Sequence, residues 1–408
     1  MRWKARFWDI VACFVAVNLF VMLLDGLLKT PIYSIVSLHS LIISDASIND
    51  LHYLIREETQ DYEPKLSGDL ILVNTGSLPN DSVRLALSNL IQVLDKYQPK
   101  VIGLDLVLDS NLIALGTSEL LKTLATTPRM VIAKSPQIGK LNPVISPSSA
   151  RGIVSFPDKQ STVRRYSSQE NTFGVLVAQM LKKDSLAAFD ESTFFINYQT
   201  MADGIYTVDS PEFDFVLLDS SFRPSSFLML EGKDILNNDS LTLRALALLG
   251  NGRAFILGHL GNTNLYDVKY DGEDRHRVPP ERQLVNREKS MFGILIHANA
   301  IENILNPELR YSCWSDSLIY QIIRAMIILI YIYYLLYYKL IKIINIFFSI
   351  FLISFPVIYL VLYLMTFQIY IDLGFVLIQI ILLEDAVEVY QSLRDFILTK
   401  LGYEKTHF

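Results

Sequence analysis

The sequence predicts an α/β domain with a mostly parallel sheet and flanking helices, in a chain that also contains four transmembrane α-helices. Short apolar runs alternate with amphipathic stretches between residues 70 and 133, at the spacing of strand–helix–strand units. Four longer apolar runs, at residues 10–28, 318–338, 343–365 and 373–390, approach the roughly 20 residues with which a helix crosses a bilayer. The 408-residue chain therefore combines a soluble middle with membrane segments on both sides of it.

The first elements of the middle region have the clearest signals. Residues 70–73 are uniformly apolar and short, as expected of a buried strand. Residues 82–97 carry apolar side chains at helical spacing, and Pro99 ends this helix. A second strand is predicted over residues 101–107. Further strands are predicted at 130–133, 152–156, 194–198, 215–218 and 254–258, and further helices at 118–125, 172–182 and 292–306.

Basic side chains predict the orientation of the chain in the membrane. Arg2, Lys4 and Arg6 precede the first apolar run, whereas Lys29 follows it. Lysine or arginine also follows the second and fourth runs, and cytoplasmic segments are enriched in these residues. We therefore expect both termini in the cytoplasm. The expected parts are a stub with the first transmembrane helix (1–30), an extracytoplasmic domain (31–316), transmembrane helices 2–4 (317–390) and a short cytoplasmic tail (391–408).

The composition argues against several functional classes. No basic tract favours nucleic acid, and the two cysteines, Cys13 and Cys313, lie in or beside apolar runs where pairing is not expected. The histidines match no zinc-ligand spacing, and neither a G-x-S-x-G elbow nor a glycine-rich phosphate loop occurs. We therefore predict no metal, no cofactor and no catalytic residue, and expect that the protein is not an enzyme.

Two positions in the middle region are candidates for contact with a ligand. Asp105 comes near the end of a predicted strand, and sites in open parallel sheets form at the carboxyl edge. There it could bind a ligand cation or hydroxyl, cap the next element, or pair with an arginine. His297, with Asn299, lies near the start of the last predicted helix. It could contact a ligand, or it could be buried and satisfied by the loop around residues 274–277.

Ionisable side chains also occur inside the last apolar runs. Arg324 lies about two turns into the second run, and Glu384, Asp385 and Glu388 lie in the fourth. A charge at such depth costs about 2.5–3.5 kcal/mol on insertion scales. These side chains could extend toward the headgroups, or they could contact helices of another membrane protein. Glu384 and Glu388 are one turn apart and share a face, so we expect this face to be the contact.

Several motifs follow one another along the middle region. They are PKVIGLD at 99–105, GIVSFPD at 152–158 with VRR at 163–165, INY at 196–198, RAFILG at 253–258, EDR at 273–275 and FGILIHAN at 292–299. In this order they resemble the CHASE2 extracellular sensory domain, and the resemblance covers about residues 35–385. Three transmembrane helices after such a domain are also the arrangement of that family.

The resemblance implies additional candidate residues. Asn74-Thr75 stands where the family often has an Asp pair, Arg164 belongs to the central motif and could bind an anion, and Asp274 belongs to the closing motif. Adjacent arginines in a strand face opposite sides, so at most one of Arg164 and Arg165 points into a pocket. The ligand-binding candidates are Asn74, Asp105, Arg164, Asp274, His297 and Asn299, and the partner-contact candidates are Arg324, Glu384 and Glu388.

The resemblance also implies a cellular role. Members of the family commonly carry a cyclase or kinase after the last span, whereas this sequence ends at Phe408. We therefore expect a sensory or docking protein of the bacterial inner membrane that acts through another membrane protein, with the large domain in the periplasm or outside. A small extracytoplasmic ligand is a further candidate partner. The alternative is a structural subunit of a cell-envelope complex, whose domain is a scaffold without a small ligand.

Overall fold

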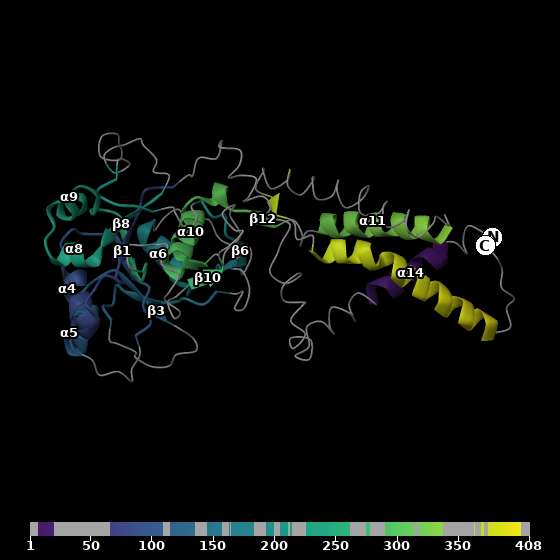
Figure 1. Cartoon of the computed structure of the whole chain (residues 1–408), viewed down its shortest axis with the longest axis horizontal. Helices are drawn as coiled ribbons and strands as arrows, with labels where there is room; N and C mark the ends of the chain where they lie inside the picture. Colours follow the sequence, from purple (N-terminus) through teal and green to yellow (C-terminus); the bar gives the residue numbers. More distant parts are fainter. Residues whose placement is uncertain are drawn as a thin grey trace. The chain divides into compact units, whose positions relative to one another are not determined.

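The computed structural model of the chain consists of two compact units (Figure 1). One unit is Arg56–Tyr311, and the other combines Met1–Ile55 with Ser312–Phe408. The structure describes residues 7–19, 66–108, 115–134, 145–156, 163, 165–182, 193–199, 205–210, 213, 226–261, 275–277, 290–313, 318–337, 363, 369–370 and 374–400.

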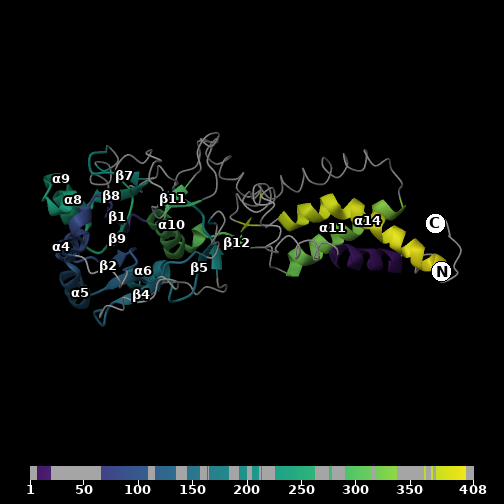
Figure 2. The same ribbon diagram turned by 60° about the horizontal axis from the view of Figure 1, so that its bottom comes forward.

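A seven-stranded sheet forms the centre of the unit Arg56–Tyr311 (Figure 2). The strand order is β4-β3-β2-β9-β1-β8-β7, and every pairing in this sheet is parallel. The predicted α/β class with a mostly parallel sheet is therefore confirmed. The strands are β1 (Leu70–Asn74), β2 (Val101–Leu104), β3 (Met130–Lys134), β4 (Ala150–Ile153), β7 (Ile205–Tyr206), β8 (Phe227–Glu231) and β9 (Ala254–Gly258).

Helices cover both faces of this sheet. Because side chains alternate between the faces of a strand, Ile102 and Leu104 belong to one hydrophobic core and Gly103 faces the other side. The first core is closed by α4 (Val83–Asp95), α5 (Thr117–Thr126), α8 (Gly232–Leu236) and α9 (Ser240–Leu249). The second face carries α6 (Phe173–Leu181) and α10 (Gly293–Leu305), which also pack against each other.

Shorter elements complete this unit. The β5–β6 pair and the β10–β11 pair are both antiparallel. A 3₁₀ turn, η2, precedes α4, and a second one, η3, follows α10. Their bounds are β5 (Arg165–Ser167), β6 (Thr193–Phe195), β10 (Arg275–Arg277), β11 (Ser290–Phe292), η2 (Asn80–Ser82) and η3 (Pro307–Leu309).

Most of the elements predicted from the sequence occur, but the short strands β5, β7, β10 and β11 were not predicted, and one longer region also differs. The prediction contained no element between residues 219 and 253, where the structure has β8, α8 and α9. α8 has only five residues and is separated from α9 by a turn in which Asn238 has a φ of 56°. So short a helix has no helical periodicity to detect. The strand predicted at 215–218 lies outside the described residues.

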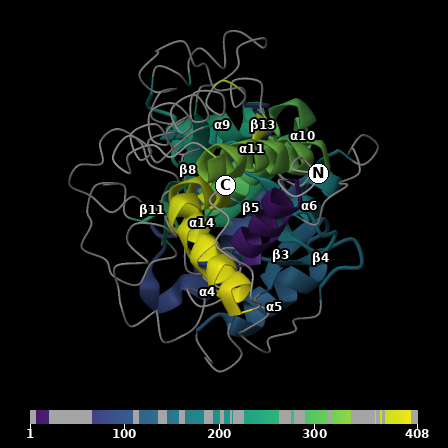
Figure 3. The same ribbon diagram turned by 90° about the vertical axis from the view of Figure 1, so that its right-hand side faces the viewer.

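The other unit contains helices from both ends of the chain. Residues 7–19 are helical, and α11 (Leu318–Tyr337) packs against α14 (Gly374–Lys400), as Figure 3 shows. A short parallel pair joins β12 (Ser312–Cys313) to β13 (Ile369–Tyr370). Within the described ranges, no helix combines the length and the apolar character that crossing a bilayer requires. The structure therefore does not support the four predicted transmembrane helices.

Candidate functional site

The carboxyl ends of β1, β2 and β8 bring polar residues to one edge of the sheet. Asn74 ends β1, Glu231 ends β8, and Asp105 directly follows β2. Backbone hydrogen bonds hold this edge together beyond the strands, because the Asp105 N–H donates to the Leu257 carbonyl over 2.8 Å. This is the edge at which open parallel sheets form their sites, and it is where the sequence placed Asp105.

Asn74 uses its whole side-chain amide to join three strands. Its Nδ2 donates to the Glu231 carboxylate over 3.2 and 3.1 Å and to the Gly261 carbonyl over 2.9 Å. Its Oδ1 accepts from the Gly76 N–H over 2.9 Å and from the Leu260 N–H over 3.0 Å. These bonds use both donor hydrogens and both acceptor sites of the amide. Asn74 is buried and holds together the ends of β1, β8 and the segment after β9.

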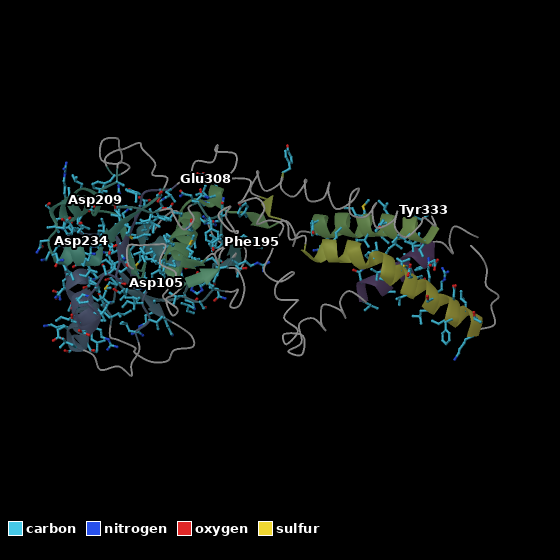
Figure 4. The ribbon with its side chains drawn as sticks, viewed as in Figure 1. Asp105, Phe195, Asp209, Asp234, Glu308 and Tyr333 are labelled. Carbon is cyan, nitrogen blue, oxygen red and sulfur yellow. The ribbon has the colours of Figure 1, made fainter. Side chains whose placement is uncertain are left out.

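Asp105, His297 and Tyr166 form a second buried group at the same edge. His297 Nε2 lies 3.8 Å from Asp105 Oδ1, and its Nδ1 lies 2.5 Å from the Tyr166 hydroxyl. The Gly174 N–H donates to that hydroxyl over 3.0 Å. The hydroxyl can therefore donate its own hydrogen to Nδ1, an assignment that leaves Nε2 as the N–H facing Asp105. Figure 4 labels Asp105 among the side chains of this unit.

Aromatic rings enclose the His297 imidazole. Phe156 stacks on it with the ring centroids 5.0 Å apart, and Phe173 approaches it edge-on at 5.1 Å. Burial raises the pKa of the Tyr166 phenol far above its ordinary range, so this hydroxyl stays neutral. The group can orient hydrogen bonds and bear an Asp–His charge pair, but the phenol cannot supply an oxyanion nucleophile at neutral pH.

Amide side chains of α10 bind the backbone that follows β6. Asn303 Oδ1 accepts from the Asn197 N–H over 2.7 Å, and its Nδ2 donates to the Asn197 carbonyl over 3.0 Å. One turn earlier, Asn299 Oδ1 accepts from the Gln199 N–H over 2.9 Å. Every residue of α10 is buried, so these amides replace the water that the backbone would otherwise bind.

The structure brings together some of the predicted ligand-binding residues. Asp105 and His297 meet, whereas Asn74 bonds to Glu231 and Asn299 to Gln199. Of the alternatives for Asp105, the observed partner is a histidine. His297 is buried, with Tyr166 and Asp105 as its polar partners, and Phe156 links it to His276 of β10 through a ring contact of 4.7 Å. Arg164 and Asp274 lie outside the described residues.

Sequence reasoning missed several members of this edge. Tyr166 follows Arg164 and Arg165, and only Arg164 of these three residues was a candidate. The Arg165 guanidinium lies over the Phe195 ring, 4.6 Å from its centroid. Glu231 belongs to the strand that was not predicted. Tyr166 lies between the polar residues Arg165 and Ser167, and this alternation could have indicated a strand with Tyr166 on its buried face.

The predicted partner-contact residues lie on the helices of the other unit. Arg324 is half-buried on α11, and Glu388 is exposed on α14. Glu384 belongs to α14, but its side chain lies outside the described part of the chain.

Comparison with known proteins identifies one family. The family described as CHASE2 domain matches residues 60–332, which include the seven-stranded sheet and both groups at its carboxyl edge. No curated protein and no solved structure matches the chain.

Proposed function

The chain belongs to the CHASE2 domain family, which comprises extracytoplasmic sensory domains, and on this premise we propose that it senses or docks a partner outside the cytoplasm and acts through another membrane protein. The observation that carries the proposal is α10. Its first turns bring His297 to the sheet edge beside Asp105, and the chain continues from its end through η3 toward α11.

A sensor needs an element that can carry a change between two sites. α10 suits this role because all of its residues are buried and because its polar side chains reach three parts of the domain. His297 contacts Asp105 after β2 and Tyr166 of β5, and Asn299 and Asn303 bind the backbone at 197–199. A shift of α10 would break several buried hydrogen bonds at once, and such a shift is a discrete change of state rather than a gradual one.

We further propose that the apolar runs at residues 10–28, 318–338, 343–365 and 373–390 hold the domain at the bacterial inner membrane, with both termini cytoplasmic. Among the described residues, most of the large apolar side chains that are exposed lie on helix 7–19, α11 and α14, where lipid or a partner helix would cover them. Arg394 Nη1 lies 2.8 Å from Asp9 Oδ2, and Tyr390 donates to Asp9 Oδ1 over 2.7 Å. These contacts tie the start of the first helix to the end of the last one, as expected when both termini are on the same side.

The partner contact is testable on α14. We expect Glu384→Gln combined with Glu388→Gln to reduce the membrane protein that co-purifies with the full chain, because both acids share one helix face. Asp385→Asn is the matched control, since its position is displaced by about 100° around the helix. The measurement is quantitative mass spectrometry after mild solubilisation of native membranes. Unchanged recovery with the double variant would reject this contact.

A scaffold without a small ligand is the second candidate. The observation in its favour is that Asn74, His297 and Asn299 are buried and already bonded to protein groups. Asp105→Asn separates the two candidates, because the amide can still accept a hydrogen bond from His297 but carries no charge. If the domain is a scaffold, this variant should leave the recovery and the activity of the co-purified partner unchanged. If it is a sensor, the recovery or the activity of the partner should change while the stability of the domain does not.

A further inference from the structure

A buried carboxylate connects the place where the chain enters the domain to the place where it leaves. Glu302 of α10 has no exposed surface. Its Oε2 accepts from the Ser67 N–H over 2.9 Å, and its Oε1 lies 2.8 Å from the Ser67 hydroxyl. Oε2 also accepts from Asn306 Nδ2 over 3.1 Å. Ser67 precedes the first strand of the sheet, and Asn306 follows α10 directly. We name Ser67, Glu302 and Asn306 the Glu302 clasp.

Hydrogen bonds from Ser67 and Asn306, rather than a paired cation, provide the main compensation for a negative charge on Glu302. In the segment before β1, the carboxylate of Asp69 adds a repulsive charge, and Lys182, directly after α6, adds a weaker attraction. The residues of α6, β9 and β11 that pack against α10 include no ionisable side chain. Two charged residues follow α10 in the chain. The Arg310 guanidinium donates to the Asn303 and Ile304 carbonyls, and the Glu308 side chain of η3 is exposed.

Burial without a paired cation favours the neutral acid. Burial raises the pKa of Glu302 to about 7, against the lowering effect of the two Ser67 hydrogen bonds. The neutral acid also fits the geometry, because a protonated Oε1 can donate to the Ser67 hydroxyl while Oε2 still accepts the Ser67 N–H. Removing the proton leaves an unpaired buried charge next to Asp69.

We propose that the Glu302 clasp is a proton-responsive device that joins the entry and exit segments of the domain in mildly acidic surroundings and releases them as the pH rises. No ligand is needed for this response. The opening of the clasp is independent of the proposed sensory function. Its interpretation as a signal rests on that function.

The direction of the pH dependence follows from linkage. The pKa of Glu302 is raised in the folded clasp from an ordinary 4.5 to about 7. The stabilisation is therefore fully present below pH 4.5 and is lost as the pH rises through 7. Between these limits the equilibrium constant for opening should rise by about tenfold per pH unit, and it should level off above the folded-state pKa.

Hydrogen–deuterium exchange of the full chain in lipid nanodiscs tests the proposal without any partner protein. The probes are peptides that contain the Ser67 and Asn306 amides, since Ser67 N–H bonds to the Glu302 side chain and Asn306 N–H bonds to the Glu302 carbonyl over 2.9 Å. After correction for intrinsic exchange, we expect protection at both sites to fall about tenfold per pH unit between pH 5 and pH 7. Protection that stays constant over this range would overturn the proposal.

Two variants make the assignment specific. Glu302→Gln keeps an acceptor for Ser67 N–H and a donor for its hydroxyl, so it should remain protected with no pH slope. Glu308→Gln changes an exposed glutamate in the next turn and should keep the wild-type slope. A slope that persists in Glu302→Gln would assign the response to another group. If Glu302→Gln does not fold, the infrared band of a protonated carboxyl in the wild-type chain is the second measurement. This band should disappear over the same pH range in which the amide protection falls, and a band that disappears in another range would contradict the proposal.

Discussion

At the scale of single residues, buried polar side chains at the carboxyl edge of the sheet bond to protein groups. Asn74 is the clearest case, because a carboxylate, a carbonyl and two N–H groups surround one amide. An asparagine is the side chain of this size that can donate and accept at once. An ionised aspartate at this position could not donate to Glu231, whereas the Asn74 amide can.

We expect Asn74→Asp to lower the free energy of unfolding by at least about 2 kcal/mol at pH 7, because it removes the amide donor of the buried hydrogen bonds to Glu231 and Gly261 and sets two carboxylates against each other. The loss should be smaller at pH 5, where one carboxyl can be protonated and donate. Urea titration of the purified chain at both pH values measures this. Asn251→Asp, in an exposed turn, should change stability by less than about 0.5 kcal/mol. An equal effect of the two substitutions would contradict the role of Asn74.

His297 should stabilise the fold through Tyr166 and Asp105 rather than through its size. His297→Phe keeps a ring between Phe156 and Phe173 but removes both polar contacts, so we expect a loss of roughly 2–4 kcal/mol. Tyr166→Phe removes the same hydroxyl contact from the other side. Because the two residues share one hydrogen bond, the double variant should lose less than the sum of the single ones. Strict additivity in thermal unfolding would show that the two side chains act independently.

At the scale of elements, glycines determine how closely α6 packs on the sheet. A Cβ at Gly152 would collide with the backbone of Phe173, meeting its Cα and, at 2.8 Å, its N. A Cβ at Gly103 would meet only side-chain ends, Ile256 Cδ1 and Phe173 Cζ, at 3.0 Å each. Side-chain ends can rotate away, whereas the first turn of a helix can move only as a unit.

Gly152→Ala should therefore destabilise the domain more than Gly103→Ala does. We expect a loss of roughly 1–3 kcal/mol for Gly152→Ala, because α6 must shift away from β4, and a smaller loss for Gly103→Ala. Parallel urea titrations give both values under one condition. The reverse order of the two losses would mean that α6 does not lie as close to β4 as the structure places it.

At the scale of the whole molecule, the proposed topology places the domain and the two termini on opposite sides of the membrane. In a background with Cys13 and Cys313 replaced by serine, Thr406→Cys should react with an impermeant thiol reagent only after the cells are permeabilised. Asp271→Cys, in the polar segment between β9 and β11, should react in intact cells. The measurement is labelling by a maleimide that adds mass. Labelling of Thr406→Cys in intact cells would place the tail outside and reject the topology.

The sequence by itself determined the class of the domain and the family. Strands such as 70–73 and 101–104 are short apolar runs separated by an amphipathic helix, and this local periodicity survives folding because burial requires it. The same local signals were not recognised for β8, α8 and α9. α8, with five residues, is too short for a helical period, whereas β8 and α9 are as long as β1 and α5, which were predicted.

Only the tertiary structure decided which polar groups meet. Asp105 and His297 are far apart in the chain, as are Ser67 and Glu302, so no spacing in the sequence relates them. Their pairing depends on the order of the strands in the seven-stranded sheet, where β9, the last of these strands in the chain, lies between β1 and β2. α10 follows later in the chain and packs on the second face of this sheet. The pKa of Glu302 depends on the same packing, since burial rather than its neighbours in sequence raises it.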